Sequence, residues 1–150
     1  MTGSSGKTAM QQHEDDIIRA VDFLYGKTTE GALAILDAPG SISKVVSMTS
    51  QRSIYCVKGS SAFASRGKGT NSEDTYLCMI PQASDDVPIY FCSCRSFMER
   101  NRHLTNESSC LCKHLLALRL MPVLQVQPVL IETASDDEFA NLLMQRIPSE

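Results

Sequence analysis

The sequence predicts an α+β fold, in which a small antiparallel sheet is accompanied by N- and C-terminal helices. Apolar residues repeat at helical spacing near both ends of the chain, whereas β-branched and aromatic residues in partial alternation fill its middle. A dense run of Cys and His follows the last of the β-like segments. With 150 residues, the chain fits a single domain, which we expect over residues 13–147.

The N-terminal part predicts two helices after a disordered start. Residues 1–12 are small and polar, as is typical of disorder. Residues 13–25 carry apolar side chains at helical spacing, and Gly26 marks the end of that helix. A second short helix is expected over about residues 29–37, because Pro39 stops it.

The middle of the chain predicts strands, because its period changes to that of an antiparallel sheet. Two connections interrupt these strands: the Gly- and Ser-rich segment 59–72 predicts a mobile loop, and 81–88 a second loop. The expected strands are residues 42–49, 53–58, 74–80 and 89–91.

Two further helices are expected around the Cys and His residues, over residues 95–103 and 115–120. Pro122 ends the second of them. Residues 123–131 alternate and predict an extended segment, which Pro128 confines to a sheet edge. The last helix begins at a capping box, Ser135-Asp136-Asp137-Glu138.

The Cys and His residues form two chelating pairs, Cys92-Ser93-Cys94 and Cys112-Lys113-His114. Three thiolates and one imidazole complete a tetrahedral set for Zn²⁺ and leave no position for water or substrate. We therefore predict a CxC…CxH zinc-binding segment, a zinc finger at about residues 90–120, with a structural metal.

Two other residues are rival ligands. Cys110 could replace His114 in a second Cys-x-Cys pair, and His103 lies between the two pairs. Cys112 with His114 is preferred, because Cys110 is separated from the following helix. His103 is read as a solvated surface residue.

The zinc segment is basic although the chain carries a formal net charge of −3. Residues 92–121 hold five bases against two acids. These bases are candidate contacts to nucleic-acid phosphates, and the alternative is a solvated, mixed-charge surface. They are Arg95, Arg100, Arg102, Lys113 and Arg119.

Several classes of function are not expected. No stretch approaches the ~20 apolar residues of a membrane span, so no membrane partner is predicted. The N-terminus lacks the apolar core of a signal peptide, and the six Cys therefore indicate a reducing compartment, cytosolic or nuclear. Residues 3–8 (GSSGKT) imitate a phosphate loop without its preceding strand, so no bound nucleotide is expected. A closed metal site predicts that the chain is not an enzyme.

The C-x-C…C-x-H pattern resembles the SWIM zinc-finger family. The chain is small, with two N-terminal helices, and carries Cys-Lys-His-Leu-Leu-Ala at residues 112–117. Within the family it looks like the SWIM-domain subunits of Shu-type recombination complexes. This resemblance implies a nuclear, non-enzymatic subunit that pairs with a RecA-like recombinase paralogue and meets single-stranded DNA through the complex. Together they would promote recombinase filament assembly in homologous recombination repair. The alternative is a zinc adaptor or substrate-recognition module for another assembly, such as a ubiquitin ligase.

Overall fold

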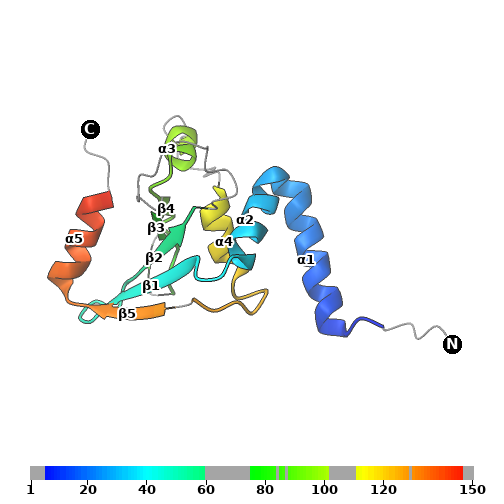
Figure 1. The fold of residues 1–150 in the computed structure, drawn as a ribbon, viewed down its shortest axis with the longest axis horizontal. Helices are drawn as coiled ribbons and strands as arrows, with labels where there is room; N and C mark the ends of the chain where they lie inside the picture. Colours follow the sequence, from blue (N-terminus) through cyan, green and yellow to red (C-terminus); the bar gives the residue numbers. More distant parts are fainter. Residues whose placement is uncertain are drawn as a thin grey trace.

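The computed structural model describes residues 6–59, 75–83, 85–86, 88–101, 111–128 and 130–146. Over these residues, helices surround a five-stranded sheet (Figure 1), which confirms the α+β class. No helix in the described ranges is long and apolar enough to cross a membrane. In chain order the elements are α1 (Ala9–Tyr25), α2 (Lys27–Asp37), β1 (Ile42–Ser47), β2 (Ser53–Lys58), β3 (Thr75–Met79), β4 (Phe91–Cys92), α3 (Arg95–Asn101), α4 (Lys113–Leu120), β5 (Leu130–Ala134) and α5 (Asp136–Arg146).

The strands lie in the order β4-β3-β2-β1-β5. β1 pairs with β2, β2 with β3 and β3 with β4, each antiparallel as expected. The predicted loop at 59–72 lies outside the described residues from residue 60 onward. The antiparallel part of the sheet is thus confirmed.

The pairing of β5 corrects the prediction of a purely antiparallel sheet. β5 runs parallel to β1, with Ser43 opposite Leu130 and Ser47 opposite Ala134. A strand that returns after a helical crossover can lie parallel to an earlier one, and α4 lies in this connection. The extended segment expected at 123–131 is mostly wrong, because residues 121–125 form a turn and the strand begins only at Leu130, after Pro128. This strand does occupy a sheet edge, as expected.

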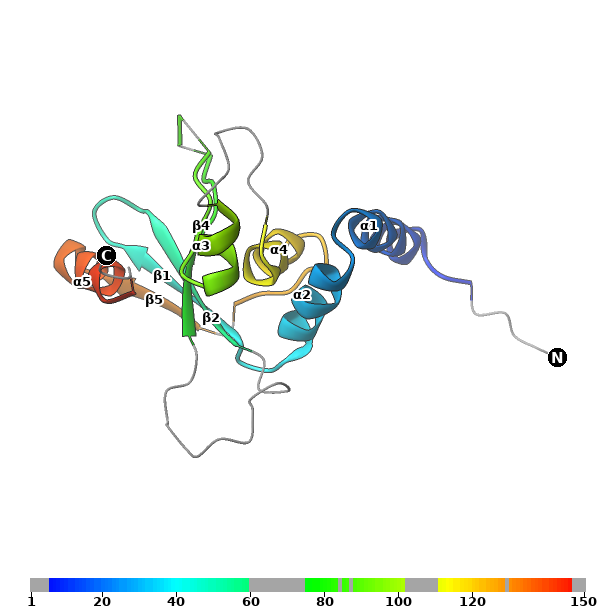
Figure 2. The same cartoon turned by 90° about the horizontal axis from the view of Figure 1, so that it is seen from above.

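Two apolar clusters cover the two faces of the sheet. The larger cluster joins α2 and α4 to the sheet and includes Ile35, Leu115 and Leu118. The smaller one, with Ile54 and Phe139, lies under α5. Seen from above, α5 lies on one side of the strands and α2 with α4 on the other (Figure 2).

α2 and α4 pack closely because Gly31 has no side chain. A Cβ atom at Gly31 would lie 3.0 Å from Cδ and 3.3 Å from Cβ of Lys113. Lys113 opens α4, so this contact sets where the second chelating pair lies.

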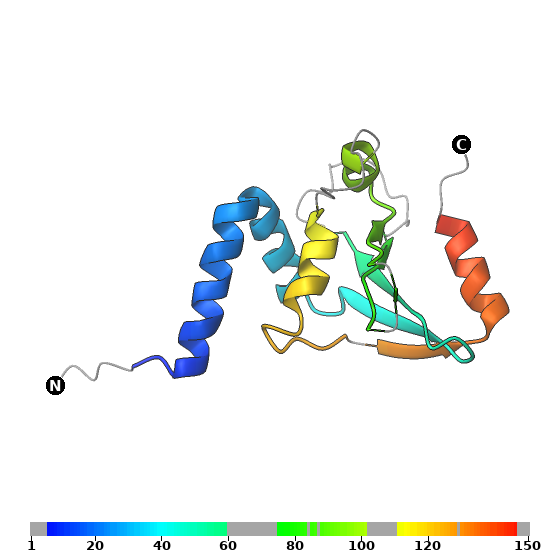
Figure 3. The same ribbon diagram turned by 180° about the vertical axis from the view of Figure 1, so that it is seen from behind.

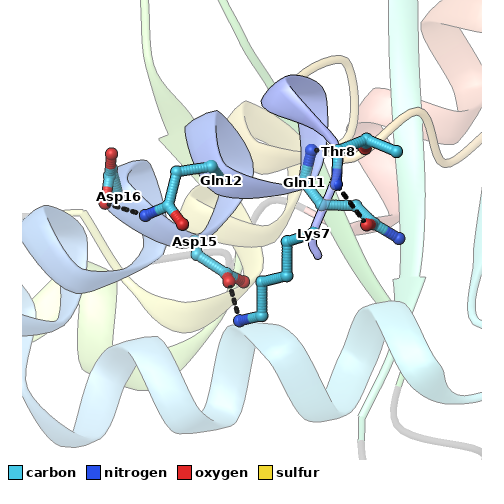
Figure 4. A network of polar contacts seen from close by, with 6 residues as sticks. All are labelled: Lys7, Thr8, Gln11, Gln12, Asp15 and Asp16. Atoms are coloured by element: carbon cyan, nitrogen blue, oxygen red, sulfur yellow. Dashed lines mark hydrogen bonds and ion pairs between the residues drawn. The ribbon is translucent and has the colours of Figure 1, made fainter. Parts of the chain in front are cut away.

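Helix α1 begins earlier than expected. Thr8 and Gln11 form a capping box, in which the Gln11 N–H donates to Thr8 Oγ1 at 3.3 Å and the Thr8 N–H donates to Gln11 Oε1 at 3.0 Å (Figure 4). Lys7 also pairs with Asp15, eight residues further along the chain. The prediction of disorder over 1–12 is therefore wrong for residues 9–12, because these local contacts stabilise the first turn. Helix α1 has no buried residue and extends from the body beside α2 (Figure 3).

Candidate metal centre

The four predicted ligands come together at one point. Donor atoms of Cys92, Cys94, Cys112 and His114 all lie within 4.8 Å of one another. All four residues are buried, and none is more than 4 % exposed. The two pairs, far apart in the sequence, thus form one cluster that can hold a metal ion.

The first pair is fixed where β4 ends and α3 begins. The backbone N–H of Ser93 donates to the Leu77 carbonyl at 3.0 Å, and the Leu77 N–H donates to Ser93 Oγ at 2.9 Å. The Phe97 N–H donates to Cys94 Sγ at 3.3 Å. An N–H donor stabilises a thiolate over a thiol, so the backbone of the first α3 turn prepares Cys94 for a cation.

The second pair belongs to the start of α4. Cys112 is the N-cap residue of this helix and His114 lies in its first turn. The Leu116 N–H donates to the Cys112 carbonyl at 2.9 Å, which ties the cap into the helix. The cluster therefore joins the end of strand β4, at Cys92, to the start of helix α4, at Cys112.

The imidazole of His114 is held in place by packing. Its ring lies 4.3 Å, centroid to centroid, from the ring of Tyr76 on β3, and Nδ1 is 3.7 Å from Cys92 Sγ. Nε2 is buried and has no hydrogen-bond partner among the described residues. A buried polar atom without a partner costs about 1–3 kcal/mol, so a histidine is costly here unless a further group, such as a metal, engages the ring.

The three sulfurs compete for negative charge. Hydrogen bonds from Cys112 and then Cys92 lower the pKa of Cys94. Hydrogen bonds with Cys92 and then Cys94, together with burial, raise the pKa of Cys112. One thiolate is therefore favoured at the expense of its neighbours. A divalent cation would stabilise all three thiolates at once, and a set of three sulfurs and one nitrogen fits Zn²⁺.

A fifth cysteine lies against the cluster. Cys78 on β3 is directly opposite Cys92 on β4, and its Sγ donates to Cys92 Sγ at 3.5 Å. Cys78 is fully buried, and the sequence does not predict its contact with a ligand. The contact follows from the register of β3 against β4, and the spacing of Cys78 from the ligands in the sequence does not predict it. The rival ligands Cys110 and His103 lie outside the described residues.

The five candidate phosphate contacts are divided between two helices and one undescribed position. Arg95 and Arg100 are exposed on α3, although Arg95 Nε donates to Glu99 at 2.7 Å. Lys113 is half-buried against Gly31, and Arg119 lies 5.9 Å from the centre of the Tyr90 ring. Arg102 lies outside the described residues. Arg95 and Arg100 thus share one short exposed helix beside the metal cluster.

The fold and the cluster define a class of protein: a small α+β zinc-finger protein with a closed Cys₃His site. Comparison with known proteins gives the family. The chain is 31 % identical over 131 residues to zinc finger SWIM domain-containing protein 7 of Mus musculus, covering 87 % of this chain and 70 % of the relative. It is 29 % identical over 136 residues to the protein of that name from Homo sapiens, covering 91 % and 80 % respectively. The chain belongs to the SWIM-type zinc-finger family.

Neither of the other comparisons adds a relative. No protein-family model matches the chain, and no solved structure matches it. The family assignment therefore rests on the two mammalian relatives, and the buried Cys₃His cluster agrees with it.

Proposed function

We propose that this chain is a non-enzymatic subunit in which Zn²⁺, bound by Cys92, Cys94, Cys112 and His114, fixes the segment 90–120. In the nucleus the subunit pairs with a RecA-like recombinase paralogue. The pair promotes recombinase filament assembly on single-stranded DNA during homologous recombination repair.

The observation that carries this proposal is the closed, buried donor set. The four donors would complete a tetrahedral set around Zn²⁺, which would leave the metal no open position at which to activate water or substrate. Three of the ligands also belong to the main apolar cluster with α2 and α4. A metal at this position would hold α4 and the end of β4 in fixed positions. Fixed elements of this kind suit a subunit that binds a partner. The recombinase partner follows from the resemblance to Shu-type SWIM subunits.

Co-purification from cells, with zinc measured on the same samples, tests the pairing. The tagged chain should retain about one zinc and bring down a RecA-like paralogue. Cys112→Ser and His114→Ala should lose both, whereas Cys56→Ser, which removes a thiol outside the cluster, should lose neither. Retained zinc with an unchanged partner profile in the two ligand variants would contradict the proposal. Ubiquitin-ligase subunits in place of a recombinase would favour the adaptor alternative.

Direct contact with DNA is tested by charge removal. If Arg95 and Arg100 touch phosphates, replacing both by Ala should flatten the logarithmic salt dependence of single-strand binding by about 1.4, roughly 0.7 for each contact. The matched control is Arg19→Ala with Lys27→Ala, which removes two exposed charges from α1 and α2. An equal change in both pairs would show that α3 makes no phosphate contact in the purified complex.

A further inference from the structure

The edge strand β5 has one strand neighbour among the described residues. It pairs with β1, and no strand of the described part of the chain lies on its other side. The Met48 N–H donates to the Ala134 carbonyl at 2.9 Å, so Ala134 turns its backbone polar groups toward β1. Because these groups alternate along a strand, those of Ile131 and Thr133 point outward. Figures 1 and 3 show β5 along the outer side of the sheet.

Most side chains of β5 are exposed. Leu130 is 50 % and Ile131 is 60 % exposed, and only Ala134 of this strand is buried. Proteins usually protect such an edge by Lys, Pro, a bulge or a covering segment. Within Leu130–Ala134 the one charged residue is Glu132. Within the described residues, the strand therefore offers unpaired backbone groups for a further strand, with exposed apolar side chains beside them.

A groove runs beside this edge, between β5 and α5. Its volume is about 410 Å³. Among the described residues, two carboxylates and two amides line it, and none of the lining side chains is Lys or Arg. The residues that supply these polar groups are Glu132, Glu138, Asn141 and Gln145. The charged groups of the lining are thus both carboxylates, Glu132 on β5 and Glu138 on α5, and they form the acidic wall of the groove.

We propose that the β5 edge and this groove bind an extended, basic segment of a partner protein by β-strand addition. The outward N–H and C=O groups of Ile131 and Thr133 would supply the ladder, as in other strand-addition complexes. The acidic wall selects Lys or Arg at alternate positions of the segment. This site lies at the opposite edge of the sheet from β4, which carries Cys92 of the metal cluster, and the proposal goes beyond the proposed recombinase pairing.

A second copy of this chain is a poor occupant of the same edge. If two copies used Ile131 and Thr133 in a symmetric antiparallel pair, Ile131 of each would lie opposite Thr133 of the other. Glu132 would then lie directly opposite Glu132, and like charges directly opposite each other destabilise a sheet. The segment that fits is therefore basic and belongs to another protein.

The experiment uses the full chain and a synthetic probe, a fluorescein-labelled peptide of alternating valine and lysine. The peptide should bind, protect the Ile131 and Thr133 amides from hydrogen exchange, and shift their NMR signals. A peptide with glutamate for lysine, and one with a central proline, should not bind. Glu132→Lys with Glu138→Lys should weaken binding at least about tenfold, whereas Glu30→Lys with Asp37→Lys, an equal charge change on α2, should leave it unchanged.

Thr133→Pro gives a second test, because it removes an outward N–H while the β5 groups that face β1 remain. Zinc content and melting temperature show whether this variant is folded. Binding that tolerates Thr133→Pro in a folded protein, or that weakens equally in both charge-reversed pairs, would overturn the proposal, as would no binding at all. Sedimentation that shows dimers blocked by Thr133→Pro would assign the edge to a second copy instead. No recombinase is present, so failure here is distinguishable from failure of the proposed pairing.

Discussion

Removing one ligand from the metal cluster should remove most of the stability of the domain. A structural zinc site contributes about 10 kcal/mol or more to folding, and a whole domain is stable by only about 5–15 kcal/mol. His114→Ala also leaves three buried thiols that share one charge. We therefore expect this variant to lose its cooperative melting transition at room temperature and above, together with its zinc.

The matched control is Cys78→Ala, because Cys78 contacts the Cys92 sulfur at 3.5 Å without belonging to the four-donor cluster. This change should cost about 1 kcal/mol, which lowers the melting temperature of a domain of this size by about 2–4 °C. Zinc should remain at about one equivalent, bound up to about 10–100-fold more weakly. Circular dichroism melts and metal analysis on both variants measure these effects. The reasoning is refuted if His114→Ala keeps its zinc and melts within a few degrees of the parent.

Three further outcomes are expected. Gly31→Val should destabilise the domain by about 1–3 kcal/mol, because a Cβ atom at position 31 would lie 3.0 Å from Cδ of Lys113. Denaturant titration measures this loss of stability, and an unchanged midpoint would show that α4 moves freely. Zinc affinity should fall as pH falls, because protons compete with the metal for three thiolates and an imidazole; a competition titration with a chelator at several pH values would show it, and a flat profile would exclude thiolate ligands. Ser135→Ala should cost about 1 kcal/mol, since Ser135 Oγ accepts from the Glu138 N–H at 3.3 Å at the start of α5; equal melting curves would contradict a role for this cap.

The features that the sequence predicts well are those set by neighbours in the chain. The two chelating pairs, the start of α5 at its capping box and the β-branched and aromatic composition of β2 each involve residues a few positions apart. Each pair has a short spacing, and the sequence also predicts a strand before the first pair and a helix after the second. The structure places Cys92 at that strand end and Cys112 at that helix start. The α+β class follows from the same local signals.

Direction and register are set by tertiary packing, and the sequence predicts them poorly. The parallel alignment of β5 with β1 depends on where α4 packs, which no periodicity encodes. The contact between Cys78 and Cys92 depends on the register of two short strands. The early start of α1 is a different case, because its capping residues, Thr8 and Gln11, are only three positions apart in the sequence. The small, polar residues around them indicate disorder instead.

The parallel pair of β1 and β5 has a consequence for the order of folding. Ser43 pairs with Leu130, a separation of 87 residues (130 minus 43), and both chelating pairs lie inside this interval. During synthesis β1 therefore leaves the ribosome long before its partner exists, whereas the hairpin with β2 can close at once. Closing so long a loop carries an entropic cost that is reduced if the enclosed segment is already compact. Metal uptake by the nascent chain would thus precede and speed the docking of β5. In zinc-starved cells, chains should accumulate in which the β5 side of β1 is still unpaired and can pair with strands of other proteins.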